Sequence, residues 1–212
     1  MNPRRTQWIG LGLVAATAVV VIAAYWRLGA HSISHSSPLP VLGALPEFTL
    51  TNQFGQPMAA TAFHDQVWLA DIVFTRCAGP CPRLTRRMSE LQAALPAGLP
   101  VKLVTFTVDP EFDTPPVLKL YAQRFGAQPG RWVFLTGTKH QLYEVIVKGL
   151  KLVATATEPG KQSSDEDLFL HSTKIVLIDQ QGRIRAYYDG LDPASKPKIL
   201  ADLAAVAQDS SS

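Results

Sequence analysis

Residues 66–95 read QVWLADIVFTRCAGPCPRLTRRMSELQAAL, and this stretch decides the fold. Residues 66–74 are a near-continuous apolar run, rich in β-branched and aromatic side chains, which predicts a buried central strand. Gly79 and Pro80 force a turn after it. Pro82 suits the first turn of a helix, because its missing N–H costs nothing there. One apolar face follows at helical spacing and consists of Leu84, Met88, Leu91 and Leu95.

The rest of the chain alternates between strand and helix patterns. Strands are predicted at 47–51, 101–108 and 132–135, helices at 114–125 and 137–149, and an extra strand at 151–156. Residues 173–179 and 183–188 form a hairpin, and a helix over 194–207 closes the chain. This order predicts an α/β fold with a mixed central sheet flanked by helices and a C-terminal β-hairpin and helix. The cysteine-bearing turn between the strand at 66–74 and the helix after it is typical of the opening of a thioredoxin-like sandwich.

The amino-terminal segment has the features of a membrane anchor. Residues 8–26 are 19 uncharged residues with tryptophan at both ends, long enough to cross a bilayer core of ~30 Å as a helix. Arg4 and Arg5 precede the run and only Arg27 follows it. We therefore expect residues 1–7 in the cytoplasm, one transmembrane helix at 8–27 and everything after it outside. A cleaved signal peptide is the alternative, although its apolar core is usually shorter, about 7–15 residues.

Composition places one domain after the anchor. Residues 28–46 are rich in Ser, Pro and Gly and predict a flexible linker, residues 47–207 the folded domain, and residues 208–212 a disordered tail. The chain has 20 basic and 17 acidic residues, and three of the arginines lie in residues 1–30, which contain no acid. The remainder therefore holds 17 of each sign, which argues against a nucleic-acid partner.

The two cysteines of the chain, Cys77 and Cys81, lie on one turn where a strand meets a helix. A helix start favours thiolate over thiol, and we expect Arg76, Arg83, Arg86 and Arg87 to lower the thiol pKa further if they point toward the pair. Two thiolates suit Cu(I) and leave it in need of a third donor. His64, His140 and His171 are candidates, and His171 is favoured because it precedes the hairpin strand, whose entry faces the cysteine turn in this fold. His31 and His35 fit a solvated linker better than a metal site.

Four segments together resemble the SCO/SenC proteins: FTRCAGPCP at 74–82, TVDPEFDTP at 107–115, WVFLTG at 132–137 and HSTKIVLIDQQG at 171–182. The resemblance implies a membrane-anchored, thioredoxin-like copper protein that helps to build the dicopper centre of cytochrome c oxidase. It implies copper ligation by Cys77, Cys81 and His171, and a partner in the oxidase subunit that carries this centre. It also implies a bacterial plasma membrane location with the domain facing the periplasm or cell exterior. Asp109 and Asp113 match the family as a turn and helix-entry element and not as ligands.

Two departures from the family pattern leave other functions open. Ala78, Gly79 and Pro80 separate the cysteines where many members have an acidic residue, and Leu170 stands where many have Asp. The alternative is a membrane-tethered thiol–disulfide oxidoreductase acting on periplasmic cysteines, which needs the redox-active pair Cys77 and Cys81 but no histidine. A tethered scaffold with an inert disulfide is a third option. The sequence motif of peroxiredoxins, which share the fold, is absent.

Overall fold

The computed structural model describes residues 39–96, 98–152 and 172–209. The predicted anchor at 8–27 lies outside these ranges, as do most of the extra strand predicted at 151–156 and most of the predicted tail. Within the described ranges, every helix is too short or too polar to cross a membrane.

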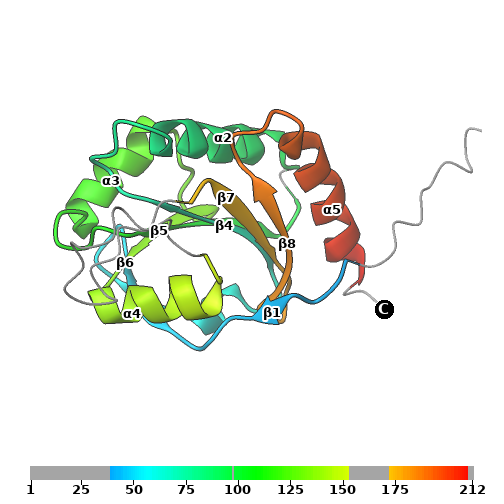
Figure 1. The fold of residues 1–212 in the computed structure, drawn as a ribbon, viewed down its shortest axis with the longest axis horizontal. Helices are drawn as coiled ribbons and strands as arrows, with labels where there is room; N and C mark the ends of the chain where they lie inside the picture. The colour runs from blue at the N-terminus through cyan, green and yellow to red at the C-terminus, as the bar shows by residue number, and fades with distance from the viewer. Residues whose placement is uncertain (1–38, 97, 153–171, 210–212) are drawn as a thin grey trace, which may run out of the picture. The chain divides into compact units, whose positions relative to one another are not determined.

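The architecture is a mixed eight-stranded sheet in the order β1-β8-β7-β4-β5-β6-β2-β3, with helices on both faces (Figure 1). In chain order, the strands are β1 (Gly43–Ala44), β2 (Thr49–Asn52), β3 (Pro57–Ala59), β4 (Val67–Val73), β5 (Val101–Thr107), β6 (Trp132–Thr136), β7 (Lys174–Ile178) and β8 (Arg183–Asp189). The three central strands β4, β5 and β6 are parallel, and the remaining strand pairs are antiparallel. The predicted mixed sheet is confirmed.

The central strand β4 is formed by the apolar run that was predicted as a strand at residues 66–74. All seven of its residues are buried, Asp71 included. Burial on both faces explains why apolar residues occupy nearly every position of this strand and do not alternate with polar ones. Because β4 has a neighbouring strand on each side, the residues that follow its C-terminal end have a fixed position at that end of the sheet.

Helices cover the two faces of the sheet. Helices α2 (Cys81–Ala94), α3 (Pro115–Arg124) and α5 (Ser195–Asp209) contribute to one core cluster, which also contains Cys77 and Cys81. The opposite face packs against the 3₁₀-helix η1 (Ala60–Phe63), α4 (Lys139–Tyr143) and the π-helix η2 (Glu144–Gly149). Figure 1 shows α2 and α3 on one side of the sheet and α4 on the other. The cysteines therefore belong to the α2–α3 face.

The structure contains strand β3 and helix η1, which were not predicted, and it differs from the sequence-based expectation at β1 and in the helix predicted over 137–149. Strand β1 falls within residues 28–46, so the end of the expected linker is part of the sheet. Strand β1 pairs with β8, and Pro46 then packs against Gly149, where an added Cβ would lie 2.7 Å from Pro46 Cδ. The helix predicted over 137–149 begins as α4 but continues as a π-helix, a local widening that residue spacing does not reveal.

Candidate functional site

The two cysteines lie on the turn between β4 and α2, as predicted. Cys77 follows the strand, and Cys81 is the first residue of the helix. Both are free thiols and both are buried, with 9% and 7% of their surfaces exposed. The backbone N–H of Gly79 donates to Cys77 Sγ at 3.4 Å, and the Cys77 and Cys81 side chains hydrogen-bond to each other. The two sulfurs are thus close enough to act on one ion or on one disulfide.

Burial reverses the expected acidity of Cys81. Desolvation raises the pKa of the Cys81 thiol to about 12, and a hydrogen bond from the Phe74 backbone offsets only part of this increase. The contact with Cys77 and the charge of Asp71 are smaller contributions to the same rise in pKa. The expectation that the helix start and the arginines lower the pKa is therefore wrong for Cys81, because loss of water outweighs them.

The arginines have other contacts or point outward. Arg76 forms an ion pair with Asp109, with 2.5 Å between Nη2 and Oδ2, and its guanidinium lies 4.3 Å from the centre of the Phe112 ring. Arg87 pairs with Glu90 at 3.4 Å. Arg83 and Arg86 are exposed on the outside of α2.

A buried carboxylate fixes the cysteine turn to the loop between β5 and α3. Asp113 is fully buried and accepts a hydrogen bond from the Thr75 backbone N–H at 3.1 Å. The Thr75 hydroxyl also donates to it, and the Thr107 hydroxyl does so at 2.5 Å. Asp109 adds a second link through Arg76. The expected turn and helix-entry role of these aspartates is therefore incomplete, because they also hold the segment that carries Cys77.

A second buried acid, Asp71, lies on the face of β4 that α2 and α3 cover, and it is not among the site residues predicted from the sequence. It is a cross-strand neighbour of Thr105, whose hydroxyl donates to Asp71 Oδ1 at 2.6 Å. Among the described residues, no group donates to its Oδ2. Complete burial raises the pKa of Asp71 from 3.8 to about 7. The available signal was one acid inside an otherwise apolar strand, since such a residue is rarely buried without a reason.

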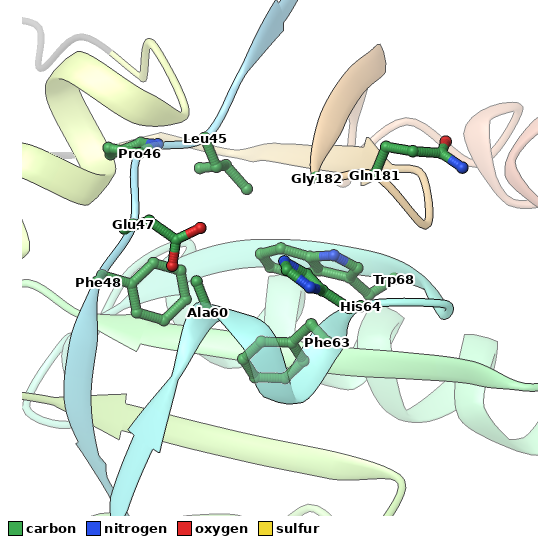
Figure 2. Close-up of a pocket in the computed structure, with 10 residues that line it drawn as sticks. All are labelled: Leu45, Pro46, Glu47, Phe48, Ala60, Phe63, His64, Trp68, Gln181 and Gly182. Atoms are coloured by element: carbon green, nitrogen blue, oxygen red, sulfur yellow. The ribbon is translucent and has the colours of Figure 1, made fainter.

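The predicted histidines do not form a cluster with the cysteines in the described part of the chain. His171, the favoured third ligand, lies outside the described residues. His64 lines a small pocket of about 40 Å³ with Phe63, Trp68 and Gly182 (Figure 2). Trp68 lies near the start of β4, so this pocket is at the opposite end of the strand from the cysteines. His140 lies on α4, on the other face of the sheet. In the described ranges, no group of three His, Cys, Asp or Glu side chains is placed to hold a metal ion.

The strand that follows His171 begins beside the cysteine turn. Strand β7 pairs antiparallel with β4, with Ala70 opposite Val176 and Trp68 opposite Ile178. Because the two strands run in opposite directions, β7 begins at the end of the sheet where β4 ends. Ser172, the first described residue before β7, therefore enters the sheet at the end that carries Cys77.

Comparison with known proteins gives one consistent family. The SCO1/SenC family model matches residues 42–208. The SCO1 protein homolog of Bacillus subtilis is 32% identical over 158 residues, which cover 74% of this chain and 79% of the relative.

Solved structures agree. BsSco, described as having a disulfide switch and as a member of the Sco family of cytochrome c oxidase assembly proteins, superposes with a TM-score of 0.67 at 29% identity. It covers 81% of this chain and 98% of that one. A SCO1/SenC family lipoprotein of Bacillus anthracis has a TM-score of 0.65 at 30% identity and covers 79% and 97%. Copper-bound ScoI of Bradyrhizobium japonicum shares the fold, with a TM-score of 0.62 at 23% identity over 77% and 99%. The chain therefore belongs to the SCO1/SenC family.

Proposed function

We propose that this chain binds one copper ion through Cys77 and Cys81, with His171 as the third ligand, and serves in building the dicopper centre of cytochrome c oxidase. The observation that carries the proposal is the pair of reduced, mutually contacting thiols on a buried turn. Thiolates are the soft ligands that Cu(I) prefers, and imidazole is a suitable third donor. The start of β7 beside the same turn supports His171, because only Ser172 and Thr173 separate it from that strand.

Protonation of Cys81 and oxidation of the cysteine pair would both control copper binding. A copper ion must displace the thiol proton of Cys81, whose pKa burial raises to about 12, so loading releases protons and weakens as pH falls. Thiol–disulfide exchange with a partner disulfide, which takes up the two electrons and leaves as two thiols, would convert Cys77 and Cys81 to a disulfide, remove both thiolates and release the ion. The cargo would pass to the oxidase subunit that carries the dicopper centre. Residues 8–27 would anchor the domain to the bacterial plasma membrane with the site on its outer side.

Copper titration of the reduced chain, followed by metal analysis and by absorption and EPR spectra, tests the proposal. We expect one copper per chain, its loss in Cys77→Ser and in Cys81→Ser, and weaker binding in His171→Ala. His64→Ala is the matched control, because that ring lies at the other end of β4, and it should bind as the parent does. Copper binding that survives all three ligand substitutions would overturn the site assignment.

Thiol–disulfide exchange is the second candidate function. The contact between the two thiols favours it, because the pair is poised to close into a disulfide, and the similar protein BsSco is described as having a disulfide switch. A reductase of partner cysteines requires Cys77 and Cys81 but not His171. Full turnover of a disulfide substrate by His171→Ala, in a chain that binds no copper, would favour this function over the first.

A further inference from the structure

Arg76 is held beside the cysteine turn by two different contacts. Its Nε and Nη2 donate to Asp109 Oδ2 at 3.1 and 2.5 Å, and the guanidinium lies over the Phe112 ring, 4.3 Å from its centre. Even so, 56% of the Arg76 side chain is exposed. A long side chain that is fixed at one edge and one face loses little further freedom when its outer edge binds a ligand.

The outer edge of this guanidinium still has donors to offer. An arginine carries five N–H donors in a planar fork, and Asp109 takes two of them. Within the described part of the chain, no group accepts a hydrogen bond from Nη1. Such a planar fork matches the two oxygens of a carboxylate. Arg76 is therefore positioned to bind a carboxylate that arrives from solvent.

The fold places Arg76 next to the thiol that a partner must reach. Cys77 follows Arg76 directly, so their Cα atoms are ~3.8 Å apart. Strands β4 and β5 run parallel with Val73 opposite Thr107, so the loop that carries Phe112 leaves the sheet beside the segment that carries Arg76. A partner segment that brings its own sulfur to Cys77 then comes within reach of the Arg76 side chain.

The charges around the turn also favour an anion. Glu111, the most exposed acid of the loop that carries Phe112, already pairs with Lys139 at 3.1 Å. Arg83 and Arg86 are exposed on α2, where none of the described acids forms an ion pair with either. The turn thus carries an excess of positive charge, but of its three exposed arginines only the one at position 76 is fixed by an ion pair and a ring contact.

We propose that Arg76, stacked on Phe112, binds a carboxylate beside the cysteine of the partner segment that meets Cys77. The partner is therefore a cysteine-bearing segment with an aspartate or glutamate next to that cysteine. The exposed Phe112 ring offers apolar surface for the stem of the same acidic side chain. The inference rests on the proposed function only in that Cys77 meets the partner, in copper transfer or in thiol–disulfide exchange.

The test compares two peptides that differ only in charge, using the full-length, reduced, metal-free chain. The blocked pentapeptides Gly-Glu-Cys-Glu-Gly and Gly-Gln-Cys-Gln-Gly are each supplied as the disulfide-linked dimer. Cys77 attacks the peptide disulfide and releases one peptide thiol, and Cys81 releases the second as the Cys77–Cys81 disulfide forms, so the peptide disulfide is the oxidant. In the parent chain at low salt, we expect the rate constant of the first release to be about 5-fold higher for the acidic peptide.

Three variants assign this preference to one side chain. Arg76→Gln should bring the ratio of the two rate constants to about 1, because the amide cannot form a charged fork. Phe112→Ala should lower the ratio in the same direction, because the guanidinium loses its stacking partner. Arg83→Gln is the matched control: it removes the same charge from a nearby exposed position and should retain the ratio of the parent. A merely structural role for Arg76 would slow both peptides and leave their ratio unchanged.

Three results would overturn the inference. The first is equal rate constants for the two peptides in the parent chain, and the second is a ratio in Arg76→Gln equal to that of the parent. The third is an equal fall of the ratio in Arg83→Gln, because the preference would then come from the general positive charge of the turn. Each of these results leaves the copper site as proposed. Copper retained in Cys77→Ser would overturn that site instead, and the peptide ratio measured on the parent would stand.

Discussion

Replacement of Asp113 by alanine should loosen the cysteine turn and lower stability sharply. The carboxylate is fully buried and accepts hydrogen bonds from the Thr75 N–H, the Thr75 hydroxyl and the Thr107 hydroxyl. A hydrogen bond to a charged group contributes about 1.5–3 kcal/mol, and bonds that share one acceptor are not additive. We therefore expect Asp113→Ala to lower the free energy of unfolding by about 3–5 kcal/mol.

Urea unfolding followed by tryptophan fluorescence measures this change. For a domain of this size, the expected loss corresponds to a fall in Tm of roughly 10 °C. Glu111→Ala in the same loop is the matched control: its side chain is 76% exposed and pairs with Lys139 at 3.1 Å, and such pairs contribute about 0–1 kcal/mol. If Asp113→Ala proves no less stable than Glu111→Ala, the Asp113 carboxylate does not hold the cysteine turn.

Two further predictions concern stability. Because burial raises the pKa of Asp71 from 3.8 to about 7, the folded chain retains a proton that the unfolded chain loses. The associated stability is complete below about pH 4 and is lost as pH rises through about 7, by up to about 4 kcal/mol. Urea unfolding at several pH values across this range should show the free energy of unfolding declining with pH in the parent and not in Asp71→Asn. An equal decline in the two proteins would refute the assignment of this pH dependence to Asp71. Thr138 caps α4 with a reciprocal bond to Gln141, whereas the side chain of Thr114 makes no capping bond to α3. Thermal melts should therefore show that Thr138→Ala costs about 1 kcal/mol, and that Thr114→Ala costs little. Equal losses would contradict the capping assignment.

Local sequence signals predicted the elements that position the site. The near-continuous apolar run over 66–74, rich in β-branched and aromatic residues, predicted a strand buried on both faces, and Pro82 located the start of α2 to within a residue. Thr114 was likewise found as the residue before α3. These features depend on a few neighbouring residues, so they can be recognised without knowledge of the tertiary structure.

The chemistry around the cysteines could not be predicted in the same way. The raised pKa of Cys81 depends on how far the helices of the α2–α3 face exclude water from it, which its neighbours in sequence do not determine. The contact of Asp113 with Thr75 joins residues 38 positions apart. Which oxygen of Asp71 lacks a hydrogen bond depends on a chain of hydrogen bonds across three strands, from Trp132 to Thr105 and from Thr105 to Asp71. Each of these properties is set by packing between distant segments.

The most direct test of the proposed copper site is X-ray absorption spectroscopy of the reduced chain loaded with one equivalent of copper. We expect two sulfur scatterers and one imidazole nitrogen in the first coordination shell of the copper, with the nitrogen lost in His171→Ala and retained in His140→Ala. A first shell without sulfur, or an imidazole signal that persists in His171→Ala, would contradict it.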